Sequence, residues 1–247
     1  MIGKSKIKFL TSLKETKYRK VHRRFIAEGN TLVIDFLNSG SAVEGVFALK
    51  SWIDKYGDKF PGINIEEISD REMRKISNLK NHSEVLAVVA MSKKREEISL
   101  VPDKWSLMLD GIRDPGNMGT IIRAAEWFGV ENIYCSTDTV DAYNPKVVQA
   151  TMGSLARIKI HYASLAKLLS EKPRTLTAYG TFLTGDDIRN VEKGNCGVIV
   201  IGSEAHGISN ELVPLIDKKI TVKPAPSSKA ESLNASVAAA LACFALI

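Results

Sequence analysis

The sequence predicts an α/β protein with a small N-terminal α/β domain and a larger C-terminal domain built on a parallel sheet. From residue 105 onward, apolar strand-like segments alternate with helical segments, the order typical of a parallel sheet covered on both faces. Residues 197–201 read Gly-Val-Ile-Val-Ile, an unbroken apolar run expected of a fully buried strand. Residues 93–104 are polar and contain a proline, so we interpret them as a linker between domains 1–92 and 105–247.

The first 92 residues carry the pattern of a small α/β domain. A short apolar segment at residues 25–29 is closed by a turn at Gly29, and Asn30 or Thr31 can cap the helix that follows it. Ser69 or Asp70 can cap a second helix, at residues 70–79. Helices are expected at residues 14–24, 31–37 and 70–79, and strands at residues 43–49 and 84–91.

The C-terminal domain is expected to contain six strands and four helices, with residues 114–117 as a turn. Ligands of parallel sheets bind at the carboxyl ends of the strands, so the loops that follow them are candidate sites. The expected strands are residues 105–109, 132–135, 158–161, 176–181, 197–201 and 220–222, and the expected helices are residues 120–128, 145–150, 164–171 and 232–247.

The basic charge is concentrated at one end of the chain. Net charge is +6, but residues 1–24 alone carry +8, so the remainder nets −2. Such an arm suits binding of a polyanion such as RNA, although a solvated basic helix would have the same composition. The candidate RNA-binding residues are Lys17, Arg19, Lys20, Arg23 and Arg24.

Composition argues against several other classes. The three cysteines are far apart in the chain and the four histidines have no ligand-type spacing, so we expect neither a disulfide framework nor a metal site. No signal peptide fits the start, and the apolar stretch at residues 235–247 is too short to span a bilayer. We therefore expect a cytoplasmic protein without a membrane partner.

The first candidate loop joins a strand to a helix at residues 114–123. Its glycines allow close backbone approach, and Asn117 can cap the helix or hold a ligand. Arg123 follows six residues later, where a guanidinium could grip a phosphate through two hydrogen bonds. A capped helix with a surface arginine is an equally open interpretation.

Two more loops complete the set of candidates. Gly202 ends the buried strand and Glu204 follows at its carboxyl edge, with Gly207 permitting a tight turn. Ser232 and Asn234 precede an alanine-rich helix, whose exposed N–H groups favour acceptor atoms. An ordinary strand-to-helix connection and a serine-capped core helix remain the alternatives for these two loops.

Together the three loops resemble the three motifs of SpoU-type (TrmH-like) RNA methyltransferases of the SPOUT superfamily. The first motif matches through Asn117, Gly119 and Arg123, the second through Gly202, Glu204 and Gly207, and the third through Ser232, Leu233, Asn234 and Ser236. Residues 23–29 are similar to the basic–aromatic–Glu–Gly signature that opens the family's substrate-binding domain. The resemblance covers nearly the whole chain.

The resemblance implies a reaction, a cofactor and an assembly. It implies methyl transfer from S-adenosylmethionine to a ribose 2′-hydroxyl of rRNA or tRNA, by a homodimer whose catalytic domain carries a deep trefoil knot. The implied catalytic residues are Arg123, Asn117, Glu204, Ser232 and Asn234. The implied cofactor-binding residues are Thr181, Gly202, Val222, Ser232, Leu233 and Asn234.

The chain departs from the family pattern between residues 220 and 232, where its loop is longer and lacks glycine. Two other functions stay open. A non-catalytic RNA-binding or ribosome-assembly factor could retain this scaffold and bind the cofactor without methyl transfer. A nucleotide-dependent oxidoreductase would need a glycine-rich dinucleotide fingerprint, which is missing here.

Overall fold

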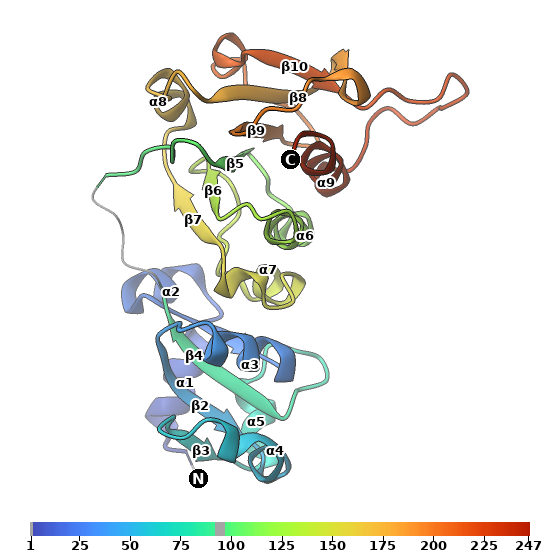
Figure 1. The fold of residues 1–247 in the computed structure, drawn as a ribbon. Coiled ribbons are helices and arrows are strands. Elements are labelled where there is room, and N and C mark those ends of the chain that lie inside the picture. Colours follow the sequence, from blue (N-terminus) through green and yellow to red (C-terminus); the bar gives the residue numbers. More distant parts are fainter. Residues whose placement is uncertain (1, 92–96) are drawn as a thin grey trace. The chain divides into compact units, whose positions relative to one another are not determined.

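The computed structural model describes residues 2–91 and 97–247, whose elements are drawn in Figure 1. The described residues form two compact units, one of residues 2–91 with 141–156 and the other of residues 97–140 with 157–247. Residues 93–96 of the expected linker lie outside the described residues. The grouping of residues 141–156 with the N-terminal unit is one that chain order alone does not predict.

The N-terminal unit is built around a four-stranded mixed sheet of order β1-β4-β2-β3. Strand β4 runs antiparallel to β1 and β2, and β2 pairs in parallel with β3. Its elements are α1 (Lys4–Ser12), α2 (Thr16–His22), β1 (Arg24–Glu28), α3 (Asn30–Asn38), β2 (Val43–Ala48), α4 (Lys50–Tyr56), η1 (Gly57–Lys59), β3 (Ile65–Glu67), α5 (Asp70–Ile76), β4 (Val85–Ala90), α7 (Pro145–Ala150) and η2 (Ser154–Ala156).

The basic N-terminal segment is folded into two helices. Helix α1 was not expected, yet Leu10 and Leu13 are fully buried beside the sheet. The helix expected at 14–24 ends at His22, because Arg23 adopts a left-handed conformation (φ 52°) and Arg24 begins β1. The expected helices at 31–37 and 70–79 and the strands at 43–49 and 84–91 are confirmed within a few residues.

Arg19 has a structural role that its sequence position does not reveal. Its side chain is 1% exposed and forms an ion pair with Asp141, with 2.7 Å between Nη2 and Oδ2. Its Nη1 also donates to the carbonyl oxygens of Leu13 and Lys14. A guanidinium that is already occupied and buried cannot grip RNA phosphates, so the expectation that Arg19 contacts RNA is corrected.

The Glu28–Gly29 pair, part of the signature noted in the sequence, is also structural. Glu28 is buried, and its carboxylate accepts hydrogen bonds from the Ser77 hydroxyl and from the Asn78 backbone N–H. Gly29 has a φ of 106°, a conformation that favours glycine. These contacts fix the turn from β1 into α3.

The second unit is built on a six-stranded sheet of order β10-β8-β9-β5-β6-β7 in which every pairing is parallel. The parallel sheet predicted from the alternating pattern is therefore confirmed. Its elements are β5 (Trp105–Asp110), α6 (Pro115–Trp127), β6 (Asn132–Cys135), β7 (Lys159–Tyr162), α8 (Leu165–Ser170), β8 (Thr177–Asp187), η3 (Ile188–Asn190), β9 (Gly197–Gly202), η4 (Val213–Leu215), β10 (Lys218–Thr221) and α9 (Ala235–Leu246).

Buried side chains from the sheet and helices form the core of this unit. Val198 and Val200 of β9 pack in one cluster with Leu165, Leu168 and Leu169 of α8. Helix α9 packs against β9 and against α6, as Figure 1 shows. None of the helices in residues 2–91 and 97–247 combines the length and the apolar character needed to cross a membrane.

The prediction of a turn at residues 114–117 is wrong. Asp114 is the N-cap of α6 and Pro115 occupies its first position, so residues 115–117 already belong to the helix. Proline is favoured at this position because it has no N–H to leave unpaired and its φ suits a helix. The correction places Asn117 in the first helical turn instead of before the helix.

Candidate active site

Asn117 is held in the first turn of α6 with its side chain available. Its backbone N–H donates to the Asp114 carboxylate at 2.8 Å, so Asp114 caps the helix and Asn117 does not. The Asn117 side-chain amide instead donates from Nδ2 to Oε1 of Glu204 at 3.0 Å. The first two sequence motifs, separated by 87 residues, therefore meet directly.

A tight turn after β9 positions Glu204. Ser203 and Gly207 exchange two backbone hydrogen bonds of 3.0 and 2.9 Å across this turn, and Gly207 has a φ of 67°. Gly202 is packed so closely that a Cβ there would lie 2.1 Å from the Gly207 carbonyl carbon. The Gly–x–Glu–x–x–Gly spacing is thus the spacing that this turn requires.

Asn234 is the N-cap of α9, and it also joins the first two motifs. Its Oδ1 accepts from the Ser236 backbone N–H at 2.9 Å and from the Ser236 hydroxyl at 2.6 Å. Its Nδ2 donates to Asn117 Oδ1 and to Glu204 Oε1, both at 2.8 Å. The helix expected at residues 232–247 therefore begins at Ala235, after this cap.

Asn117, Glu204 and Asn234 form a closed triangle of side-chain hydrogen bonds. Glu204 Oε1 accepts two of these bonds and a third from the backbone N–H of Ala235, at 3.3 Å. Among the described residues, Glu204 Oε2 accepts no hydrogen bond. The triangle brings the three sequence motifs together and leaves carboxylate oxygen available to a ligand.

A pocket of about 330 Å³ adjoins this triangle. The Ser136 hydroxyl and the Arg113 guanidinium hold the pKa of Asp138, one of the lining residues, below its ordinary value. The lining residues are Asp110, Gly111, Ile112, Arg113, Asp114, Asn117, Asp138, Ser203, Glu204, Ala205, His206, Gly207 and Ala235.

The remaining candidate residues lie around the triangle without joining it. Arg123 is exposed on α6, and within the described chain no hydrogen bond or ion pair holds its guanidinium. Ser232 and Leu233 are also exposed, immediately before the Asn234 cap. The structure thus brings together Asn117, Glu204 and Asn234 and leaves Arg123 able to meet a substrate.

Three of the expected cofactor residues lie on or directly after neighbouring strands of the sheet. Thr181 is in β8, Gly202 ends β9, and Val222 directly follows β10. The Thr181 hydroxyl donates to the Val200 carbonyl at 3.2 Å. After Gly180 the pairing of β8 with β10 shifts, so residues 181–185 leave the regular ladder.

These residues suit an adenosine group. Leu233 is 44% exposed and Val222 is partly exposed, so both can offer apolar surface to a purine ring. Backbone groups at the strand ends can supply hydrogen bonds to the ring and the ribose. The described residues contain no group of three or more His, Cys, Asp or Glu side chains that could hold a metal ion.

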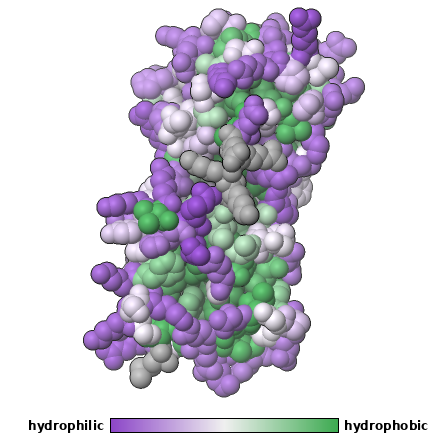
Figure 2. All heavy atoms as spheres, turned by 90° about the vertical axis from the view of Figure 1, so that its left-hand side faces the viewer, coloured by the Kyte–Doolittle hydropathy of each residue, from purple (hydrophilic) through white to green (hydrophobic). Residues whose placement is uncertain are grey.

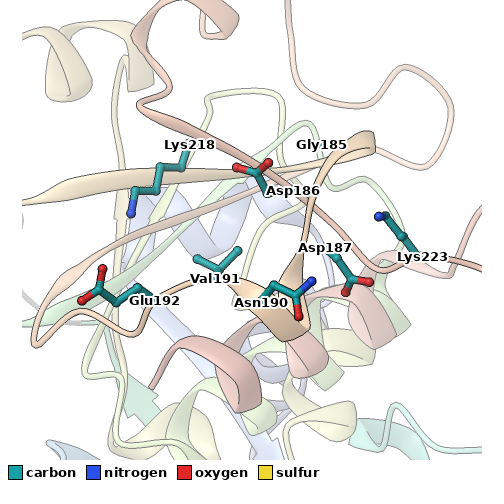
Figure 3. Close-up of a pocket in the computed structure, with 8 residues that line it drawn as sticks. All are labelled: Gly185, Asp186, Asp187, Asn190, Val191, Glu192, Lys218 and Lys223. Carbon is teal, nitrogen blue, oxygen red and sulfur yellow. The ribbon is translucent and has the colours of Figure 1, made fainter.

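A second cavity, of about 420 Å³, lies elsewhere in this unit (Figure 3). Its side chains come from the end of β8, the following segment and β10, and Asp187 in its wall is paired with Arg189 at 2.5 Å. None of the residues expected at the site lines this cavity. The pocket beside Glu204 is therefore the better candidate for the chemistry.

Sequence reasoning missed two residues of the site. Asp114 and Asp110 fix its loops, Asp114 by accepting from the Asn117 backbone N–H and Asp110 by accepting a 2.7 Å hydrogen bond from the Ser209 backbone N–H. The Asp-Pro pair at 114–115 is a helix-start signal that could have identified Asp114. Asp110 carried no such local signal.

The expected RNA-binding residues belong to the N-terminal unit. Lys17, Lys20 and Arg23 are exposed on or next to α2. Arg24 is half-buried and is paired with Glu44 across the sheet. Because Arg19 is buried and Arg24 is paired, the basic surface at α2 consists of Lys17, Lys20 and Arg23.

Comparisons with known proteins match both the N-terminal and the C-terminal part of the chain to RNA methyltransferases. Residues 104–244 match the SpoU rRNA Methylase family, and residues 4–87 match the MRM3-like substrate binding domain. The chain is 27% identical over 243 residues to the 23S rRNA (guanosine(2553)-2'-O)-methyltransferase RlmP of Bacillus subtilis, covering 98% of this chain and 95% of that protein.

Solved structures give the same result. A TrmH-family protein from Porphyromonas gingivalis superposes with a TM-score of 0.88 at 31% identity, covering 99% of this chain and 98% of that one. The rRNA methyltransferase from Sinorhizobium meliloti, solved with S-adenosylmethionine bound, gives a TM-score of 0.86 at 27% identity, covering 99% and 95%.

Proposed function

The chain belongs to the SpoU rRNA methylase family, and from this premise we propose that it methylates a ribose 2′-hydroxyl of ribosomal RNA. It is an S-adenosylmethionine-dependent RNA methyltransferase, as its relatives are. The observation that carries the proposal is the hydrogen-bonded triangle of Asn117, Glu204 and Asn234. It joins one residue from each of the three family motifs at the carboxyl ends of the sheet.

The cofactor would be held by Thr181, Gly202, Val222 and the segment Ser232, Leu233 and Asn234. When bound, S-adenosylmethionine supplies a methyl group already activated by its sulfonium, so the protein mainly has to position the reactants. The strand-end backbone and the apolar surface of Leu233 support this placement. The triangle would keep the loops that carry these residues in place.

Arg123 is proposed to bind the target nucleotide. Arginine stays protonated in proteins, so it is a poor base for the 2′-hydroxyl. Its exposed guanidinium can instead hold the adjacent RNA phosphate and stabilise negative charge as the oxygen attacks. The hydroxyl proton would pass to that phosphate while the 2′-oxygen bonds to the methyl group, and the methyl–sulfur bond would break with its electron pair staying on the neutral sulfur that leaves.

The N-terminal unit is proposed to hold the RNA. Its match to a substrate binding domain and the exposed Lys17, Lys20 and Arg23 support this assignment. The target ribose has to be reachable, so a loop or single-stranded region suits the enzyme better than an uninterrupted helix. A cytoplasmic location is part of the same proposal.

An exposed apolar face on α9 supports a homodimer. Val237, Leu241 and Phe244 are 45%, 37% and 70% exposed and lie on one side of the helix at spacings of four and three residues. Trp127, at the end of the neighbouring α6, is 83% exposed. Large contiguous apolar surfaces mark interaction sites. The trefoil knot that the family implies belongs to this proposal as well.

The test is transfer of radiolabelled methyl from S-adenosylmethionine to purified RNA, followed by digestion to nucleosides. We expect the label in a 2′-O-methyl nucleoside of ribosomal RNA. Label in a base would contradict ribose methylation, and label restricted to transfer RNA would contradict the proposed substrate. Cofactor binding without any transfer to mature RNA or to ribosomal assembly intermediates would favour a non-catalytic binding factor.

A further inference from the structure

Helix α2 presents an aromatic ring among cations on the surface of the N-terminal unit. Tyr18 is 37% exposed and the neighbouring Val21 is 68% exposed. Lys17 and Lys20 flank them and are also exposed. The N-terminal unit, in the lower half of Figure 2, carries hydrophobic residues among hydrophilic ones on the face shown. A ring that only filled the core would be covered, so this position calls for another explanation.

The Tyr18 ring is supported from within the protein. It stacks on the His22 ring with 6.4 Å between centroids and 16° between planes. His22 is in turn braced by the edge of Phe9 from α1, with centroids 5.1 Å apart. This row of three rings joins α1 to α2 and limits the ways in which Tyr18 can turn. A preorganised ring loses little freedom when a ligand binds.

The cations beside the ring are available for an anion. Lys17 Nζ lies 5.9 Å from the centroid of the Tyr18 ring. Among the described residues, neither Lys17 nor Lys20 forms an ion pair. By contrast, Lys6 is paired with Glu66 and Lys14 donates to the Ser77 carbonyl. Lys17 and Lys20 thus place two unpaired ammonium groups next to the exposed ring.

We propose that Tyr18 is a stacking platform for an unpaired base of the substrate RNA, with Lys17 and Lys20 contacting the phosphates on either side of that base. Aromatic rings bind any base through its face, and lysines follow the backbone, which together favour single-stranded RNA over a duplex. Val21 would pack against the base or its ribose. The inference rests on the proposed function, since it takes RNA to be the substrate.

The variants Tyr18→Leu and Tyr18→Trp separate stacking from packing. Leucine keeps apolar bulk without a ring face, whereas tryptophan enlarges the ring. Binding of the full-length protein would be measured by fluorescence anisotropy with a labelled single-stranded RNA of about 12 nucleotides and with the same strand in a duplex. We expect Tyr18→Leu to weaken single-strand binding roughly tenfold and Tyr18→Trp to preserve or strengthen it.

Salt dependence provides the second measurement. Tyr18→Leu removes no charge, so the slope of log K against log salt should stay unchanged. Lys17→Ala and Lys20→Ala should each lower the slope by about 0.7, the value for one lost phosphate contact on a single strand. Unchanged slopes in both lysine variants would overturn the phosphate contacts, and a changed slope in Tyr18→Leu would contradict stacking.

Tyr56 provides a matched control in the same unit. It is half-buried on Trp52 and has two lysines, Lys55 and Lys59, each 5.2 Å from its ring centroid. Tyr56→Leu should leave RNA binding within twofold of the wild type. Equal losses of RNA affinity in Tyr18→Leu and Tyr56→Leu would overturn the proposal that Tyr18 stacks on a base. So would wild-type RNA affinity in Tyr18→Leu together with weakened affinity in Tyr18→Trp.

Methyl transfer distinguishes this inference from the proposed function. If the wild type methylates RNA and Tyr18→Leu raises the KM for RNA without lowering kcat, both stand. If the wild type methylates RNA and Tyr18→Leu changes neither constant, the platform fails and the function stands. If the wild type methylates no RNA while the ring-dependent binding persists, the function fails and the platform stands.

Discussion

Asn117 and Glu204 are 87 residues apart in the chain and are joined by a 3.0 Å hydrogen bond from Asn117 Nδ2 to Glu204 Oε1. The bond depends on two local features. Asp114 caps α6, which leaves the Asn117 side chain available, and the turn between Gly202 and Gly207 brings Glu204 over the sheet edge. Asn234 closes the triangle from a third loop. The site is therefore held together by hydrogen bonds between residues of three different loops.

The first prediction tests the hydrogen bonds between these loops with the substitution Asn234→Asp. An aspartate keeps Oδ1, which caps α9, but replaces the Nδ2 donor with a carboxylate oxygen beside Glu204 Oε1. Losing a hydrogen bond to a charged group costs about 2 kcal/mol, so kcat/KM should fall roughly 30-fold. The loss should shrink at lower pH, because a proton shared by the two carboxyls restores a donor.

The control for this prediction is Asn190→Asp, which makes the same change in the separate cavity of Figure 3. It should leave steady-state methyl transfer unchanged. Wild-type activity in Asn234→Asp across the pH range would show that the triangle is unnecessary for the reaction.

The second prediction concerns the buried ion pair in the N-terminal unit. Asp141→Ala leaves the Arg19 guanidinium buried without its carboxylate, which costs about 3 kcal/mol of the free energy of unfolding. Urea unfolding measures the loss, and hydrogen exchange should quicken in α2 and β1. Asp54→Ala breaks an exposed pair with Lys50, which solvent screens, and should cost much less than Asp141→Ala. Equal effects of the two substitutions would contradict a structural role for Arg19.

The third prediction concerns stability in acid. Hydrogen bonds from the Ser69 hydroxyl and backbone N–H, and from the Ile2 N–H, lower the pKa of Glu72 from 4.5 to about 2. A lowered folded-state pKa stabilises the fold above the unfolded value, and this contribution is lost as pH falls through the folded value. Stability should therefore decline between about pH 4.5 and pH 2.

Thermal unfolding at a series of pH values checks this window. Glu72→Gln has no carboxylate to titrate, so its unfolding temperature should depend less on pH in that interval than that of the wild type. Parallel curves for the two proteins would contradict the assignment of this acid sensitivity to Glu72.

The fourth prediction concerns the apolar face of α9. Phe244→Glu places a charge on the apolar face proposed as the dimer interface, so light scattering after size exclusion should show a shift from dimer to monomer. Leu183 is 73% exposed in β8 and provides the matched control. Leu183→Glu should leave the dimer intact. A wild type that is monomeric at all concentrations would refute the homodimer.

Sequence patterns predicted the parallel sheet well and the N-terminal segment poorly, for physical reasons. Long apolar runs such as residues 197–201 are informative because few other structures bury every side chain. Helix α1 escaped prediction because its three lysines are as many as its apolar residues, and among these only Leu10 is fully buried. Strand β3 has only three residues and gives almost no periodic signal.

The site shows the same division between local and non-local information. Motif spacing identified Asn117, Glu204 and Asn234, and the rule for strand ends predicted their common edge. Neither the motif spacing nor the strand-end rule could predict the hydrogen bonds among these three residues, because the bonds join side chains far apart in sequence. Arg19 shows the converse. The basic residues around Arg19 favoured the prediction of an RNA contact, whereas its ion-pair partner, Asp141, lies 122 residues away in the chain.

The most direct test of the central claim is the rate of methyl transfer by Arg123→Ala in a single turnover, with saturating cofactor and RNA. The rate should fall about 10²- to 10³-fold, while the Kd for S-adenosylmethionine measured by calorimetry stays at the wild-type value. Arg174→Ala, which removes another exposed arginine of the same unit, should retain the wild-type rate. An unchanged rate in Arg123→Ala would contradict the assignment of this arginine to the reacting ribose.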